Sequence, residues 1–226
     1  GEADVDFDRV HAPQKRTYRI TVVESKINET MEIGRLDLIT TVESNRVVLE
    51  DIWRMNISGS KIVRPTRLQC AKSPIMPLKH YEMSVPRPGK EPLKVEGEVR
   101  DDQIHLKMLD QQRQEPFPAD TLTQSAFYRV VCGLPPVPGR SWRFDHWAES
   151  LEITRIVSEP SPMVITCVGA ERVEVEGKRV RAHQFRLDGP YALHIWVDEA
   201  GVVVRVEASS RENQKLIMTL MPPGEE

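Results

Sequence analysis

The feature that most constrains the fold is an alternation of apolar and polar residues that recurs along the chain. From Pro92 to Arg100, apolar or small residues occupy every second position, and charged residues stand between them. Successive side chains of a β-strand point to opposite faces of a sheet, so this period of two predicts half-buried strands. The segment 191–209 shows the same period on both sides of the turn Asp198–Gly201. We expect Val197 to lie opposite Val202, which places the apolar residues of both arms on one face.

Similar segments occupy most of the chain, and turn-forming residues such as Ser58-Gly59-Ser60 and Asp188-Gly189-Pro190 separate them. The pattern predicts an all-β protein, an antiparallel meander that forms a curved sheet, an open barrel or a sandwich. The other expected strands are Thr17–Glu24, Met31–Val42, Val47–Ile57, Ile62–Cys70, Lys79–Val85, Ile104–Met108, Ser141–His146, Glu152–Ser158, Met163–Cys167, Glu171–Glu176, Arg179–Leu187 and Lys215–Met221.

Residues 118–131 break the alternation and predict one short helix. Asp120 or Thr121 is expected to cap its start, and Gly133 is expected to end it. We expect this helix to act as a lid or plug against the sheet. The chain is expected to form a single β-rich domain over residues 1–226, with a sub-boundary near residues 111–139.

The charge balance excludes a general attraction to nucleic acid. The chain has 31 Lys and Arg against 34 Asp and Glu, a formal net charge of -3. Arg64, Arg67, Lys72 and Lys79 are spread over a proline-rich stretch, and their expected role is solubility. No apolar run reaches the ~18 residues of a transmembrane segment. The sequence starts at Gly1 rather than methionine, which favours an exported protein whose leader has been removed, in the periplasm or secreted. The alternative is a trimmed cytosolic protein.

No catalytic motif is present. The three cysteines, Cys70, Cys132 and Cys167, form no Cys-x-x-Cys pair and are expected to be buried and free, with one disulfide as the alternative. The chain has no Gly-x-Ser-x-Gly elbow, phosphate loop or dinucleotide fingerprint. We therefore expect no enzyme, no catalytic residues, no metal site and no cofactor. An enzyme with a site around His146 is a further alternative.

Three segments of the C-terminal half carry a resemblance to a known family: Gly133–Trp142, Glu174–Phe185 and His194–Glu207. They resemble exported bacterial proteins of a domain-of-unknown-function family. In that family a Pro-Gly strand, a Gly-x-x-Val-x-Ala-x-x-Phe hairpin and a Trp-x-Asp-x-x-Gly hairpin recur. The resemblance runs from Gly133 to Leu220. It implies a curved half-barrel similar to that of lipoprotein carriers, and it brings no catalytic residues.

These observations lead to two functional hypotheses. The first is a non-enzymatic carrier or binder of an apolar small molecule or lipid in the concave face of the sheet, supported by the tryptophans, the methionines and the apolar face of 191–206. The expected ligand-binding residues are Trp142, Tyr191, Leu193, Ile195, Val204 and Val206. The alternative is a protein-interaction or scaffolding module of the cell envelope, using a face with His194, Trp196 and Arg205.

Overall fold

The described part of the chain consists mainly of strands. The computed structural model describes residues 5–24, 29–57, 59–87, 89–147, 160–189, 192–211 and 214–224. The strands are β1 (Gln14–Glu24), β2 (Glu29–Val42), β3 (Arg46–Ile57), β4 (Ser60–Ala71), β5 (Leu78–Arg87), β6 (Lys90–Arg100), β7 (Gln103–Met108), β8 (Gln111–Pro116), β9 (Thr121–Thr123), β10 (Ser141–Trp147), β11 (Ser161–Val175), β12 (Lys178–Asp188), β13 (Leu193–Asp198), β14 (Val203–Arg211) and β15 (Gln214–Leu220). The helices of these residues are α1 (Phe7–Val10) and α2 (Gln124–Gly133). The expected strand Glu152–Ser158 lies outside the described residues.

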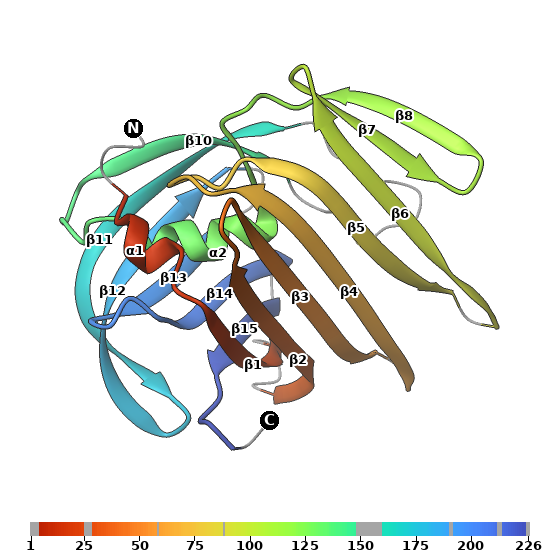
Figure 1. Cartoon of the computed structure of the whole chain (residues 1–226). Coiled ribbons are helices and arrows are strands. Elements are labelled where there is room, and N and C mark those ends of the chain that lie inside the picture. The colour runs from red at the N-terminus through yellow and green to blue at the C-terminus, as the bar shows by residue number, and fades with distance from the viewer. Residues whose placement is uncertain are drawn as a thin grey trace.

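All of these strands belong to one sheet, in the order β8-β7-β6-β5-β4-β3-β2-β1-β15-β14-β13-β12-β11-β10-β9. Neighbours pair antiparallel except β9, which runs parallel to β10. The sheet curls around α2 (Figure 1), and it therefore has an inner and an outer face. The predicted fold class, an all-β antiparallel curved sheet with a short helix, is confirmed.

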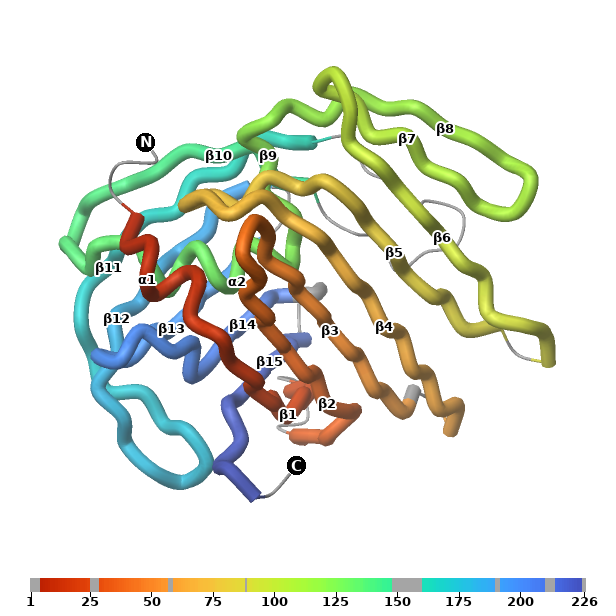
Figure 2. Tube along the Cα trace, viewed as in Figure 1, coloured from red at the N-terminus to blue at the C-terminus, as the bar shows by residue number. Residues whose placement is uncertain are grey.

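Helix α2 fills part of the space inside this curl (Figure 2), as expected for a plug. Every residue from Ser125 to Gly133 is buried. The helix ends at Gly133 as predicted, but it starts later than expected, with the Thr123 hydroxyl accepting a hydrogen bond from the Ala126 N–H at 3.1 Å. Residues 121–123 are extended because they pair with β10 as β9, so tertiary pairing overrides the local helix signal.

The described strands do not close into a barrel by hydrogen bonds, although β9 comes back to pack against β5. The contact is reinforced by three aromatic rings. Trp147 at the end of β10 packs edge-on against Tyr81 of β5 at 5.2 Å and against Phe117 at 5.6 Å, measured between ring centroids. All three rings are fully or almost fully buried. We call Tyr81, Phe117 and Trp147 the aromatic seam, because side chains rather than a backbone ladder hold the curl together there.

Strands β6, β7 and β8 extend beyond this seam at the edge of the sheet (Figure 1). Apolar side chains such as Leu93, Val95 and Ile104 are buried on their inner face, which explains the alternation found in the sequence. Strand β8 was not predicted, because its sequence Gln-Gln-Arg-Gln-Glu-Pro contains no apolar residue. It forms by backbone pairing with β7 alone, and its polar side chains suit an exposed edge.

The hairpin of β11 and β12 builds a second apolar cluster on the outer face. The pairing of the two strands shifts register between Cys167 and Gly169, and a bulge of this kind changes which residues face inward. The cluster consists of Val173, Val175, Ala182, Trp196 and Val204. Polar contacts from the hairpin to its neighbours reinforce it. The Trp196 Nε1 donates to Glu171 at 2.6 Å, and Arg19 of β1 pairs with Glu176 at 2.6 Å.

The predicted register of the β13–β14 hairpin is wrong. Val197 lies opposite Val203 rather than Val202, and Ile195 lies opposite Val206. The pairing shifts between Trp196 and Val197, so that Val203 and Val206 face the interior while Val204 joins the outer cluster. Strict alternation cannot indicate such a bulge, because the three neighbouring valines fit either register.

Candidate ligand site

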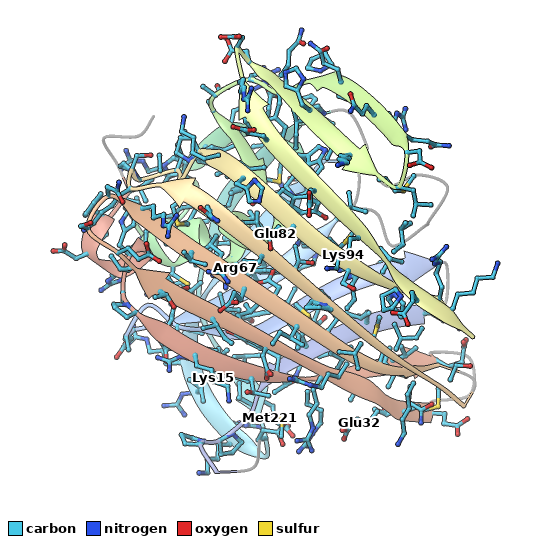
Figure 3. The ribbon with its side chains drawn as sticks, turned by 45° about the vertical axis from the view of Figure 1, so that its right-hand side comes forward. Lys15, Glu32, Arg67, Glu82, Lys94 and Met221 are labelled. Carbon is cyan, nitrogen blue, oxygen red and sulfur yellow. The ribbon has the colours of Figure 1, made fainter. Side chains whose placement is uncertain are left out.

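Arg64 is a buried arginine on the inner face of β4, and its predicted role in solubility is wrong. Its side chain shares the inner face with Thr66, Leu68 and Cys70, which follow at every second position and are also buried. The residue is 5% exposed. By contrast, Arg67 lies on the outer face and is exposed, as Figure 3 shows together with Glu82 and Lys94 on the neighbouring strands. The alternation itself carried this signal, since Leu68 and Cys70 indicate which face of β4 is inner.

The contacts of Arg64 are weak for a buried cation. Its guanidinium lies 5.7 Å from the ring centre of Trp53, its direct cross-strand neighbour, and its Nη1 is 3.9 Å from the Met83 sulfur. Among the residues that the structure describes, its Nε has no hydrogen-bond partner, and neither has the buried hydroxyl of Thr66. A desolvated cation–π contact contributes about 2 kcal/mol, whereas burying an ion costs several kcal/mol. These contacts alone leave the charge of Arg64 under-compensated.

The nearest inner carboxylate along the sheet, Asp51, is already engaged by α2. Asp51 lies opposite Thr66, accepts from the Arg129 Nη1 at 3.0 Å and accepts from the Ser125 hydroxyl at 2.5 Å. Arg129 also donates to the Thr40 hydroxyl at 3.2 Å and to the Ile39 carbonyl at 3.1 Å, which satisfies its guanidinium. Asp51 and Arg129 therefore neutralise one another. Within the described residues, Arg64 has no carboxylate partner.

The inner surface around Arg64 is apolar and incompletely covered. Helix α2 reaches β3 at Asp51, and from there towards the β3–β4 turn the inner residues Trp53 and Ile62 are only half-buried. Ile33 of β2 and Leu216 of β15 are also half-buried and pack against the same core. Half-buried apolar residues facing the inside of a curled sheet can bury further apolar surface. We call Trp53, Met55, Ile62 and Arg64 the inner patch.

The ligand-binding residues predicted from the sequence do not gather in one place. Leu193, Ile195 and Val206 lie in the inner core, each at most 5% exposed, and Val204 lies in the outer cluster. Trp142 is 4% exposed and packs against Phe185, with ring centroids 6.4 Å apart. Tyr191 lies outside the described residues. The sequence does not indicate the inner patch. Nothing in it distinguishes Trp53 from the other tryptophans, and Arg64 is expected at the surface.

Two cavities lie elsewhere in the molecule, and neither brings together a reactive site. One of about 220 Å³ on the outer face is lined by alternating charges that include Arg67, Glu82 and Lys94. The other, also about 220 Å³, brings Cys132, His183 and Asp198 to one end of the curl. Burial raises the pKa of the Cys132 thiol to about 11, so Cys132 is not a thiolate nucleophile at neutral pH. All three cysteines are buried. The described residues contain no group of metal-ligating side chains.

His146, the residue of the enzyme alternative, is buried against the plug. It is 1% exposed and packs edge-on against Phe127 of α2 at 6.1 Å between ring centroids. Burial lowers the pKa of His146 to about 4, so its imidazole is neutral at neutral pH.

Acid is expected to destabilise the protein through His146. Its folded-state pKa lies below the unfolded value of 6.5, so between pH 6.5 and 4 the unfolded chain binds a proton that the folded chain does not. Since one pKa unit corresponds to about 1.4 kcal/mol, the loss at pH 4 is roughly 3 kcal/mol. Urea unfolding at pH 7 and pH 4 measures it. Between pH 7 and pH 4, the free energy of unfolding of His146→Phe should fall by roughly 3 kcal/mol less than that of the wild type. Equal losses in the variant and the wild type would show that His146 is not the group responsible.

No protein-family model matches the sequence, and no curated protein matches it. Solved structures are similar to this chain to different degrees. A β-barrel-like protein of the domain of unknown function DUF1849 from Brucella abortus superposes with a TM-score of 0.59 at 8% identity, over 93% of this chain and 96% of that one. A DUF1089 family protein from Pseudomonas aeruginosa gives a TM-score of 0.43 at 12% identity, over 74% and 86% of the two chains. The hypothetical lipoprotein YmcC from Escherichia coli gives 0.38 at 13% identity, over 95% and 89%.

The first of these likenesses confirms, at the level of fold, the expected similarity to a domain-of-unknown-function family with a curved sheet. None of the described helices is long and apolar enough to cross a membrane.

Proposed function

We propose that this protein is a non-enzymatic binder of an apolar ligand, which lies against the inner patch on the concave side of the sheet. The observation that carries the proposal is the half-buried state of Trp53 and Ile62, apolar residues that face inward where α2 no longer covers β3 and β4. A ligand there would complete the burial of an inner face that the plug covers only in part.

The burial of the surrounding residues favours the inner patch over the β13–β14 hairpin as the ligand site. Leu193, Ile195 and Val206 are already packed in the core, so they offer little surface to a ligand. The C-terminal ends of β3, β12 and β14 lie at the same end of the sheet, because neighbouring strands are antiparallel. A ligand at the inner patch would therefore lie near that end. We also propose an envelope location, periplasmic or secreted, which the resemblance of the C-terminal half to exported bacterial proteins supports.

Native mass spectrometry of the purified protein, followed by organic extraction, tests the proposal. We expect a stoichiometric adduct of lipid mass, and we expect Ile62→Glu to abolish it, because a carboxylate in the patch opposes an apolar ligand. The matched control is Val63→Glu, since Val63 is the next residue on β4 but lies on the outer face and is 51% exposed. A ligand-free wild type that also fails to take up added lipid would contradict the proposal, as would an adduct that Ile62→Glu retains.

The alternative function, a protein-interaction module, was based on an exposed face with His194, Trp196 and Arg205. The face that motivated it was expected to be solvated, yet Trp196 is 6% exposed and covered by the β11–β12 hairpin. Arg205 is engaged by Glu207 at 2.7 Å and by the Glu174 carbonyl at 3.0 Å. We therefore do not propose it.

A further inference from the structure

We propose that Arg64 binds the anionic end of the ligand, so that the ligand class is an amphiphile with a hydrocarbon chain and one carboxylate or phosphate group. This inference rests on the proposed function, and it adds the chemistry that would distinguish one apolar ligand from another. It stands on three observations: a buried cation without a carboxylate among the described residues, unused donors beside it, and an apolar surface around it.

Arg64 is buried beside an aromatic ring and keeps donors that make no strong hydrogen bond. Arg64 is 5% exposed and lies directly opposite Trp53, whose ring supports its guanidinium at 5.7 Å. The Nε carries no hydrogen bond, and the sulfur of Met83 is a weak acceptor for the Nη1. A guanidinium presents its N–H groups in a planar fork that fits two oxygens of a carboxylate or phosphate.

A second unused donor lies on the same strand face. Thr66 follows Arg64 by two residues, is 2% exposed, and its hydroxyl has no hydrogen-bond partner. Side chains two residues apart on a strand lie about 7 Å apart along one face. An anion between Arg64 and Thr66 would satisfy both groups, whereas a neutral alkyl chain would satisfy neither.

The charge balance of the interior explains why this arginine, rather than Arg129, is available. Arg129 is fully bonded to Asp51, Thr40 and two backbone carbonyls, and its position fixes the plug. Asp51 has both oxygens occupied, by Arg129 and by Ser125. Arg64 is thus left without a carboxylate among the described residues, and the apolar residues Met55 and Ile62 lie next to it in the inner patch.

Isothermal titration of the full chain with three probes of equal chain length tests the inference: dodecanoate, dodecyl phosphate and dodecanol. We expect the wild type to bind one or both anions about 10- to 100-fold more tightly than the alcohol, the range that a charge-assisted pair supplies. The two anions separate a carboxylate ligand from a phosphate ligand. Inorganic phosphate and acetate, which carry charge without a chain, should not bind measurably, and binding as tight as that of the amphiphiles would overturn the amphiphile class.

Three variants assign the preference to Arg64. Arg64→Met should lose the preference for the anions over dodecanol, and Arg64→Lys should keep part of it. Arg67→Gln, on the outer face of the same strand, should behave as the wild type. An unchanged preference in Arg64→Met, or a wild type that binds all three probes equally, would overturn the role of Arg64 and leave the proposed function standing. If none of the three probes binds, the proposed function itself fails.

Discussion

Replacement of Asp51 by alanine is expected to lower the free energy of unfolding by about 3–5 kcal/mol, because it leaves Arg129 charged, buried and without its carboxylate. Asp51 and Arg129 are 4% and 2% exposed at their side chains, so water cannot take the place of the lost partner. The pair also joins α2 to β3, and its loss loosens the plug. Urea unfolding followed by circular dichroism measures the effect.

Asp37→Ala is the matched control. Asp37 is also a buried aspartate of the sheet, bonded to Thr17 and to Arg54, but the Arg54 side chain is 48% exposed. Arg54 can regain water when its partner is removed, so we expect a smaller loss of stability. The double variant Asp51→Leu with Arg129→Met should recover much of the loss, since apolar groups of similar volume often replace a buried ion pair without cost. If Asp51→Ala costs no more than Asp37→Ala, the pair does not fix the plug.

Trp147→Ala is expected to cost about 3–5 kcal/mol, the range for removing a large buried aromatic side chain. Trp147 is fully buried and contacts both other rings of the aromatic seam, so the cavity that it leaves lies where the curl has no backbone ladder. Denaturant unfolding measures the loss, and faster amide exchange in β9 would locate it.

Two variants calibrate this prediction. Trp147→Phe should cost much less than the alanine variant, because the indole Nε1 of Trp147 has no hydrogen-bond partner to lose. Trp53→Ala removes the same side chain from a half-buried position and should also cost less. The importance of the seam is refuted if Trp147→Ala and Trp53→Ala destabilise the protein equally.

Most of the fold could be predicted from the sequence, because the alternation of apolar and polar residues in a half-buried strand shows which side chains are buried. The hairpins of β3 and β4 and of β6 and β7 follow from it directly. What escaped prediction lacks that signal. Strand β8 has no apolar residue, β9 is specified by its pairing with β10, and the bulge that turns Val204 outward is one of several registers that three valines allow.

The candidate site was harder to predict for a different reason. Sequence motifs identify a site by reactive residues at a characteristic spacing. The inner patch is identified instead by the lack of a carboxylate partner for Arg64 among the described residues, which no motif encodes. Whether Asp51 neutralises Arg64 or Arg129 depends on where α2 enters the curl, and only the three-dimensional structure shows that it is Arg129. The face of β4 on which Arg64 lies was readable from Leu68 and Cys70, so the burial of the arginine was predictable even though its isolation was not.

The aromatic seam has a consequence for how the molecule responds to temperature. A sheet closed by hydrogen bonds resists opening by its ladder, but here β9 and β5 are apposed without one, and apolar contact supplies the closure. Apolar association near room temperature is driven by the entropy of water and weakens on cooling. Closure of this curl therefore depends on the hydrophobic effect rather than on hydrogen-bond geometry. On cooling, the junction between β9 and β5 should be the first part of the sheet to loosen.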